Sequence, residues 1–325
     1  NPGNITTLDP NTRLSNYPAD LLNQAPGINI HRGHGQEHLT ALRSPGLVGG
    51  AGAGSFLYLE DGISMRAPGF ANVNALMDAM PGHAQSIEIV RGPGSALYGS
   101  NAVHGLINFI SGPISENGTR LYSSAGSYGR YALTGQSSYV DDASAARFSI
   151  SLTGDEEGYR AASGFEQQKM RVETQWRNGT TDYHFSLAGM NLNQETAGYV
   201  KTEDCPSGQE AYEDETCAKS NPFPEAYRDA QAFRSFLRME RSLSDGATLT
   251  VTPYLRTNDM EFLMHFLPGQ AVEENEHTSI GAQISYARNS ERLSYVIGLD
   301  SELTNGELTE IQTQTATPFF HTRKK

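Results

Sequence analysis

The stretch Ser86–Ser111, SIEIVRGPGSALYGSNAVHGLINFIS, decides how the N-terminal part of the chain is expected to fold. Its apolar residues predict one strand that ends near Val90 and a second strand from Leu106 to Ile110. Four glycines and Pro93 lie between these strands. Because glycine and proline favour tight turns, the backbone is expected to fold back on itself here rather than to form a long helix.

Part of this stretch has the glycine spacing of a phosphate-binding loop. Gly94 and Gly99 are separated as that motif requires, but Ser100 and Asn101 stand where Lys and Ser or Thr are needed. Without the lysine no side chain reaches the outer phosphates, so we reject a nucleotide site. A glycine-rich turn in an ordinary β domain remains the plain alternative.

Length, charge and composition narrow the class of protein. The chain has 325 residues and a formal net charge of −13, which argues against nucleic acid as a partner because phosphate binding needs a basic face. No apolar run approaches the ~20 residues of a membrane helix. With 33 glycines and 15 tyrosines, the composition favours β structure rich in turns. If this protein lies in a membrane, it is expected to do so as a β-barrel.

Cys205 and Cys217 are the only cysteines and enclose an acidic segment. Two sulfurs without a histidine partner are too few for a structural zinc site. A disulfide that closes a surface loop would place the protein in an oxidising compartment, and two reduced surface thiols are the alternative.

The first 113 residues alternate short helices and strands with long loops. A helix is predicted from Pro18, and a second helix should carry Leu76, Met77 and Met80. Strands are predicted at 28–30, 39–43 and 56–59, and the first eleven residues are expected to be loosely held. The composition changes after Ser111, so we place a domain boundary near Pro113.

From Thr119 onward, segments of about ten residues alternate apolar with polar side chains. Phe148, Ile150 and Leu152, for example, alternate with Arg147 and Ser149. Similar alternation surrounds Val172, Leu249 and Ile280. Because successive strand side chains point to opposite faces, such strands form one apolar and one charged wall. A packed sandwich would have to bury the charged face, whereas a barrel with a plugged or aqueous lumen would not.

The connections between these strands also favour a barrel. Short links near residues 142, 179, 245 and 290 alternate with longer links around 155–167, 194–227 and 263–276, with 127–129 as an exception. Short turns on one rim and long loops on the other are typical of bacterial outer-membrane barrels. About nine strands cannot close such a barrel, because single-chain barrels have even strand numbers and plugged transporters use about 22. We therefore expect a truncated product or a partial chain.

The stretch 86–111 resembles a known signature, I-E-x-x-R-G-P-x-S-x-L-Y-G-x-x-A-x-x-G-x-I-N, of the plug domain of TonB-dependent outer-membrane receptors. LLNQAPGINI and FLYLEDGI are similar to further plug motifs, x-L-x-x-x-P-G-V-x-V and x-x-V-D-G-V. The usual I-R-G is replaced by Leu42-Arg43-Ser44, which puts the local turn in doubt but not the fold. The resemblance implies an α+β plug domain at 1–113, followed at 114–325 by an incomplete antiparallel sheet of the transmembrane-barrel type.

The resemblance also implies a function. Receptors of this family import a scarce ligand across the outer membrane of Gram-negative bacteria, driven by the TonB energy-transducing complex. A ferric siderophore or other metal chelate is the first candidate ligand, with cobalamin, heme and oligosaccharides as alternatives. No TonB-contacting segment is evident before Asn11. We expect no enzymatic activity and no cofactor, because no nucleophile stands with a base in sequence context.

Several residues are assigned roles through this resemblance. Arg43 and Arg91 match plug arginines that pair with glutamates on later barrel strands and latch the plug. Three loops, 31–38, 45–55 and 65–72, should face outward and contact ligand. Arg32, His34, Arg66 and Phe70 are the predicted contacts, because cations and an aromatic ring suit an anionic chelate. His31, His34 and His38 have a spacing that can bind a transition metal, although solvated histidines are the alternative.

Two other classes of protein compete with the receptor. A passive porin or an adhesin-like barrel would have no plug signature, so the stretch 86–111 argues against it. A non-transporting fragment, or a binding module made mainly of the plug, is consistent with the odd strand count.

Overall fold

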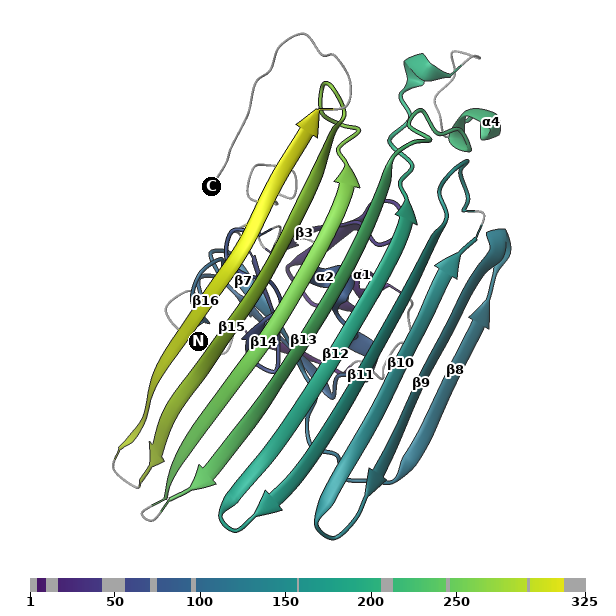
Figure 1. The fold of residues 1–325 in the computed structure, drawn as a ribbon. Coiled ribbons are helices and arrows are strands. Elements are labelled where there is room, and N and C mark those ends of the chain that lie inside the picture. Colours follow the sequence, from purple (N-terminus) through teal and green to yellow (C-terminus); the bar gives the residue numbers. More distant parts are fainter. Residues whose placement is uncertain are drawn as a thin grey trace.

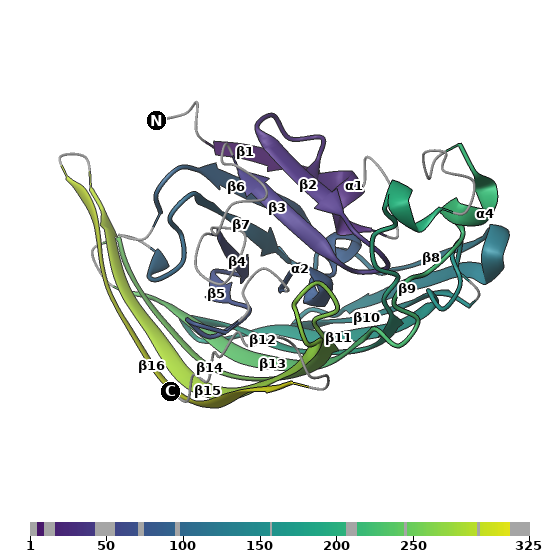
Figure 2. The same cartoon turned by 90° about the horizontal axis from the view of Figure 1, so that it is seen from above.

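The chain folds into two packed parts, a mixed helical and β head and a curved antiparallel wall (Figure 1). This computed structural model describes residues 5–9, 17–42, 56–70, 75–94, 98–156, 158–205, 213–243, 246–290 and 293–312. We call the elements between residues 5 and 110 the head, and the nine-stranded sheet that follows them the wall. Viewed from above, the head lies against the concave face of the wall (Figure 2).

The head is built on a sheet with the strand order β1-β6-β7-β4-β5, in which only the β4–β7 pair is parallel. A separate hairpin joins β2 and β3. The elements of the head are β1 (Ile5–Leu8), α1 (Pro18–Leu22), β2 (Ile28–Arg32), β3 (His38–Leu42), β4 (Phe56–Glu60), β5 (Ile63–Ser64), α2 (Ala75–Asp78), η4 (Pro81–His83), β6 (Ser86–Arg91) and β7 (Gly105–Ile110).

The stretch 86–111 forms the centre of this sheet, as its pattern predicts. Strands β6 and β7 pair antiparallel, with Arg91 opposite Gly105. Gly92, Gly99 and Gly105 have positive φ angles of 104°, 82° and 151°, which side chains with a Cβ rarely adopt. Ile87, Ile89, Ile107 and Phe109 are buried in the main core of the head.

Two expectations for the head are corrected. The first eleven residues were expected to be loosely held, but Ile5–Leu8 is an edge strand paired with β6. Such pairing uses backbone groups and leaves little trace in the side-chain pattern. The second helix ends at Asp78 and does not include Met80, because Pro81 opens a separate 3₁₀ turn and disfavours helical backbone at the residue before it.

The wall is a meander in which each strand pairs with the next one along the chain. Its described strands number nine, and the predicted boundary at Pro113 falls between β7 and β8. The elements of this part are β8 (Gly118–Ala125), η5 (Ser127–Gly129), β9 (Arg130–Val140), β10 (Ser144–Asp155), β11 (Phe165–Asn178), β12 (Thr181–Glu195), η6 (Thr202–Asp204), α4 (Glu215–Ala218), β13 (Tyr227–Ser242), β14 (Ala247–Leu263), β15 (Ala271–Asn289) and β16 (Ser294–Gln312). The predicted fold class is confirmed.

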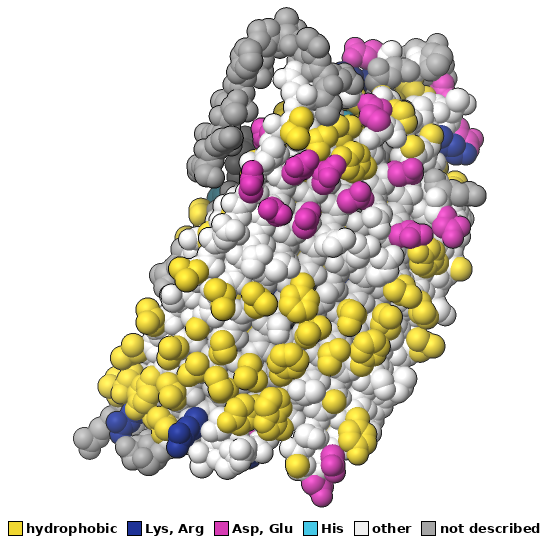
Figure 3. Space-filling view, viewed as in Figure 1, with side chains coloured by type: hydrophobic (Ala, Val, Ile, Leu, Met, Phe, Trp, Pro, Cys, Tyr) yellow, Lys and Arg dark blue, Asp and Glu magenta, His cyan; other side chains and the backbone are white. Residues whose placement is uncertain are grey.

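The two faces of the wall differ as the alternation predicts. On the face away from the head, apolar side chains gather in a belt across the strands (Figure 3), including the exposed Phe148, Met170, Ile280 and Leu303. Acidic side chains gather beyond this belt, toward the end of the wall that carries the long loops. No second sheet covers the belt within the described residues, so the wall is not half of a dry sandwich.

The links between wall strands follow the expected layout. Short turns join β9 to β10, β11 to β12, β13 to β14 and β15 to β16 at one end, and longer segments lie at the other end (Figure 1). Among the described residues, the helices are all too short or too polar to cross a membrane.

Candidate functional site

Three carboxylates of the head face the concave side of the wall. Glu60 ends β4 and Asp61 occupies the tight turn to β5, where Asp61 and Gly62 have φ angles of 50° and 82°. Asp78 ends α2. The exposed fractions of Glu60, Asp61 and Asp78 are 5%, 7% and 1%. Buried carboxylates require charged partners or hydrogen bonds, and the wall supplies both.

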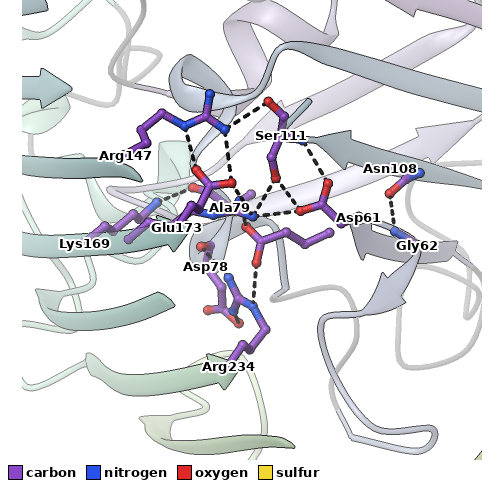
Figure 4. A network of polar contacts seen from close by, with 12 residues as sticks. Asp61, Gly62, Asp78, Ala79, Asn108, Ser111, Arg147, Lys169, Glu173 and Arg234 are labelled. Atoms are coloured by element: carbon purple, nitrogen blue, oxygen red, sulfur yellow. Dashed lines mark hydrogen bonds and ion pairs between the residues drawn. The ribbon is translucent and has the colours of Figure 1, made fainter. Parts of the chain in front are cut away.

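Arg171 of β11 holds the turn that carries Glu60 and Asp61. Its Nη1 donates to Glu60 at 2.9 Å, and its Nη2 donates to Asp61 at 2.7 Å. The same Nη2 donates to the hydroxyl of Ser111 at 2.6 Å, and that hydroxyl in turn donates to Asp61 (Figure 4). Arg171 is 4% exposed, so the guanidinium and both carboxylates are almost fully withdrawn from water.

Neighbouring wall residues extend this contact. Arg234 Nε donates to Glu60 at 3.2 Å, and Arg234 Nη1 lies 3.7 Å from Asp78. Arg147 makes two hydrogen bonds to Glu173, at 2.7 and 3.0 Å, and a third to the Ser111 carbonyl oxygen at 3.1 Å. We call Glu60, Asp61, Asp78, Arg147, Arg171, Glu173 and Arg234 the buried ion network (Figure 4).

The wall also binds backbone carbonyl groups of the head. Lys169 Nζ donates to the Ala79 carbonyl oxygen at 2.8 Å, and Gln167 Nε2 donates to the Met77 carbonyl oxygen at 3.1 Å. Arg238 donates to the carbonyl oxygen of Asp61. Apolar contact adds to this, since Met77 packs with Met190, Leu192 and other wall residues in one buried cluster. Polar and apolar contacts therefore seat the head at the same place.

The buried ion network fixes the position of the head on the wall but adds little net free energy of folding. Removing two charges from water costs about as much as their attraction returns, but removing one partner of a buried pair costs about 3–5 kcal/mol. Burial by itself would raise the pKa of Asp61, yet Arg171 and two hydrogen bonds from Ser111 outweigh burial and hold that pKa below its ordinary value. Asp61 is therefore charged at neutral pH.

Two predicted ligand contacts, Arg66 and Phe70, lie in the head–wall contact. Arg66 has no exposed surface, and its Nη2 donates to Asp78 at 3.2 Å. Its Nε and Nη1 find no acceptor among the described residues. Phe70 stacks on His277 of β15 with ring centroids 4.8 Å apart. In this state of the molecule Arg66 offers no surface to a ligand, so its predicted role would require movement of the head.

The first predicted loop, 31–38, lies against the long-loop end of the wall. Arg32 is exposed and stacks over the ring of Tyr17, 3.9 Å from its centroid. The ring of His34 contacts the Ser163 carbonyl oxygen, and burial lowers the pKa of His34 below its ordinary value. Glu37 forms an ion pair with Arg228 of β13 at 3.0 Å.

The three histidines of this loop are in different environments. His31 is exposed, His34 is half-buried and His38 is 6% exposed. In the part of the chain that the structure describes, no three His, Cys, Asp or Glu side chains lie close enough to hold a metal ion. The metal site at His31, His34 and His38 gains no support from this geometry.

The predicted latch residues Arg43 and Arg91 do not belong to the buried ion network defined above. Arg43 lies outside the described residues. Arg91 Nη1 donates to Thr6 Oγ1 at 2.6 Å and to the Pro26 carbonyl oxygen at 2.8 Å, both within the head. The predicted latch places arginines of the head on glutamates of the wall. The ion pairs of the buried ion network that join the two parts instead place carboxylates of the head on arginines of the wall. Two features of the sequence indicate charged groups at this contact, the Glu60-Asp61-Gly62 turn and the charged inner positions of β11. Neither feature shows which residue is its partner.

Cys205 and Cys217 form a disulfide in the long segment between β12 and β13. The side chain of Asp214 caps the short helix α4, accepting from the backbone N–H groups of Thr216 and Cys217 at 2.9 and 3.2 Å. The bond therefore ties α4 to Cys205 near the start of this segment.

Comparison with a family model decides what the head is. Residues 5–106 match the model described as the TonB-dependent Receptor Plug Domain. The head is a TonB-dependent receptor plug domain. The recognition made from the stretch 86–111 is therefore confirmed, and the fold of the wall is shared with the solved structures described next.

Solved structures show the same fold. The chain is similar to the ferric citrate transporter FecA in its unliganded form, with 15% identity and a TM-score of 0.76 over 96% of this chain and 49% of that chain. It is similar to the ferric yersiniabactin uptake receptor FyuA from Yersinia pestis, with 16% identity and a TM-score of 0.73 over 94% and 49%. It is also similar to the copper transporter OprC, with 17% identity and a TM-score of 0.70 over 94% of this chain and 47% of that chain. The chain thus spans about half the length of these transporters and receptors.

Acid is expected to loosen the plug through His83, which has an exposed fraction of 7% beside the wall. Burial, with Arg171 and Arg147 nearby, lowers its pKa from 6.5 to about 4. The unfolded plug therefore takes up a proton below pH 6.5 that the folded plug refuses until about pH 4. Stability should fall across this window, by roughly 2 kcal/mol between pH 7 and pH 5 from His83 alone.

Urea unfolding of the plug at pH 7 and pH 5, in the wild type and in His83→Gln, measures this effect. The variant should lose the share of the difference that comes from His83, roughly 2 kcal/mol. His38, whose pKa burial lowers to about 3, should contribute a similar amount, which remains in the variant. Asp61 does not interfere, because a lowered carboxyl pKa loses its stabilising effect only below the ordinary value of 3.8. An unchanged difference in the variant would exclude His83 as the source.

Proposed function

We propose that this chain is the plug and part of the barrel of a TonB-dependent receptor that imports a scarce ligand across the outer membrane of a Gram-negative bacterium. A ferric siderophore or other metal chelate is the first candidate ligand. Support comes from the plug-domain match and from the similar solved proteins, which are described as carrying ferric citrate, ferric yersiniabactin and copper.

One observation carries this proposal. The plug packs on the charged face of the wall through Arg171 and its neighbours, while the opposite face presents an apolar belt with exposed Phe148, Met170 and Leu303. A wall built this way meets lipid on one side and a polar lumen on the other. The short turns then lie on the periplasmic side, and the disulfide-bonded segment lies outside the cell.

The plug contact suits a gate that opens under force. Its charges are buried and paired, so the closed state is well defined, yet buried ion pairs add little net stability. Pulling by the TonB complex would separate Glu60 and Asp61 from Arg171, and water would then solvate both sides. An energy source outside the outer membrane can act in this way on a domain of low local stability.

The long-loop end of the wall offers a surface for the ligand. Tyr199, Phe223, His265 and Phe266 form a chain of ring contacts there, with successive centroids 6.4, 4.9 and 5.6 Å apart. Tyr199 and Phe266 are more than half exposed, at 55% and 53%. Aromatic rings of this kind, with Arg32 and His34 on the plug side, would receive an anionic chelate with an apolar or aromatic frame.

Uptake of radioactive metal tests the proposal. Cells that carry the gene, cells that lack it, and gene-bearing cells without TonB are supplied with ferric citrate, a ferric catecholate or a copper chelate. We expect accumulation of at least one metal only when both the gene and TonB are present. Equal accumulation of metal without TonB would indicate a passive channel. If no chelate accumulates, labelled cobalamin, heme and oligosaccharide are tested in the same cells, and a lack of uptake of all of them would favour a non-transporting protein.

A further inference from the structure

Three buried arginines form a single row across the concave face of the wall. Arg171 of β11 is opposite Ala188 of β12, Ala188 is opposite Arg234 of β13, and Arg234 is opposite Arg256 of β14. Arg256 is 1% exposed and Arg234 is 9% exposed. Directly opposed like charges on neighbouring strands destabilise a sheet, so this arginine row requires anions nearby.

The wall does not supply enough of these anions itself. The arginine row and the two rows beside it contain two carboxylates, Glu173 and Glu302, and five buried cations, Arg147, Lys169, Arg171, Arg234 and Arg256. Arg120 of β8, farther along the same row, is exposed. The plug carboxylates Glu60, Asp61 and Asp78 match the excess of three positive charges. Arg66 adds one more cation from the plug, and it is the guanidinium whose Nε and Nη1 lack acceptors among the described residues. The closed interface is therefore rich in cations.

We propose that withdrawal of the plug uncovers the arginine row as a transient binding track for an anionic cargo that bears carboxylate or phosphate groups. This inference rests on the proposed function, because it requires the plug to move during import. When Glu60, Asp61 and Asp78 leave, Arg171 and Arg234 keep their positions on the wall strands and lose these counter-charges. Arg256 loses its contact with the Ser64 carbonyl oxygen of the plug and keeps its ion pair with Glu302 of β16. Planar guanidinium groups bind carboxylate and phosphate through paired hydrogen bonds, so such a cargo replaces the plug carboxylates in turn.

A cysteine placed in the arginine row can report its charge. Ser149 is opposite Arg171 at one end of the row, is 1% exposed, and its hydroxyl has no partner among the described residues. Ser149→Cys is therefore a small change, and the two native cysteines are joined to each other. In cells with the full receptor and an active TonB complex, labelling by two methanethiosulfonates of similar size is compared, one carrying a sulfonate and one a quaternary ammonium. Each rate is divided by the rate of the same reagent with a small free thiol.

The arginine row predicts that both reagents require TonB and that the anionic reagent labels at least about tenfold faster, because a charged cleft concentrates ions of opposite sign. Adding Arg171→Gln should bring the ratio close to one. Should Ser149→Cys fail to fold, Ser279→Cys reports from beside Arg256 in the same row. Equal rates for the two reagents would overturn the anion track while leaving plug movement intact. Labelling by neither reagent would contradict plug movement, and the track with it.

Discussion

Replacing Arg171 with alanine is expected to weaken plug docking by about 3–5 kcal/mol, which is the cost of leaving buried carboxylates without their partner. Arg171 is the one described side chain that pairs with both Glu60 and Asp61, and it also holds Ser111. Both carboxylates are largely withdrawn from water in the docked state, since each residue is less than 10% exposed. The plug should therefore release at lower urea concentration, and protease should cut it while the wall persists.

Two controls separate docking from general damage. Arg177→Ala removes an arginine from the same strand, but its partner Asp182 is exposed and the pair is screened by water, so plug release should stay near the wild type. Arg171→Lys keeps the charge but loses the forked donor geometry, and an intermediate effect is expected. If Arg171→Ala and Arg177→Ala released the plug at the same urea concentration, the buried ion network would not be what holds the plug.

Replacing Gly105 with alanine is expected to destabilise the plug by roughly 2–6 kcal/mol, from backbone strain together with overpacking. Gly105 opens β7 with a φ of 151°, a conformation that residues with a Cβ rarely adopt. An added Cβ would also overlap the carbonyl oxygen of Val90 and the side chain of Leu42. Because Val90 belongs to the paired strand β6, the clash cannot be relieved without shifting the central pair of the sheet.

Gly82→Ala is the matched control for this prediction. Gly82 also lies in the plug, but an added Cβ there would meet no atom within 4 Å. The urea concentration at which half of the Gly82→Ala plug is unfolded should remain close to that of the wild type. The Gly105→Ala plug should unfold at a clearly lower urea concentration. A Gly105→Ala plug as stable as the Gly82→Ala plug would show that β7 tolerates a side chain at its first residue.

Local pattern was enough to predict the individual elements. Alternation around Phe148 and Val172 predicted nine strands with one apolar face, because the two faces of a strand differ by a single residue step. The same logic missed β1, whose pairing with β6 depends on backbone groups. It also extended the second helix to Met80, since the helical spacing of apolar residues continues up to Met80, directly before Pro81.

The site was harder to predict because its partners are distant in sequence. Arg171 is separated from Glu60 by 111 residues, and each side chain taken alone looked like a charged position on a strand or in a turn. Arg66 and Phe70 were assigned to ligand because their loop was expected to face outward, yet the packed structure places them against Asp78 and His277. Arg91, for which a glutamate on a barrel strand is the predicted partner, donates to Thr6 and to the Pro26 carbonyl oxygen, which are both in the head.

The sequence by itself therefore determined the plug signature, the strand count and which face of each strand is apolar, because turn chemistry and side-chain alternation are local properties. Only the tertiary structure decided which charges meet. Pairing of buried charges depends on how the turn after β4 is placed against β11 and β13. These segments are far apart in the sequence, so no local pattern predicts that they meet. Hence the plug is held by its own carboxylates on wall arginines, a polarity that became visible only when the two parts were packed together.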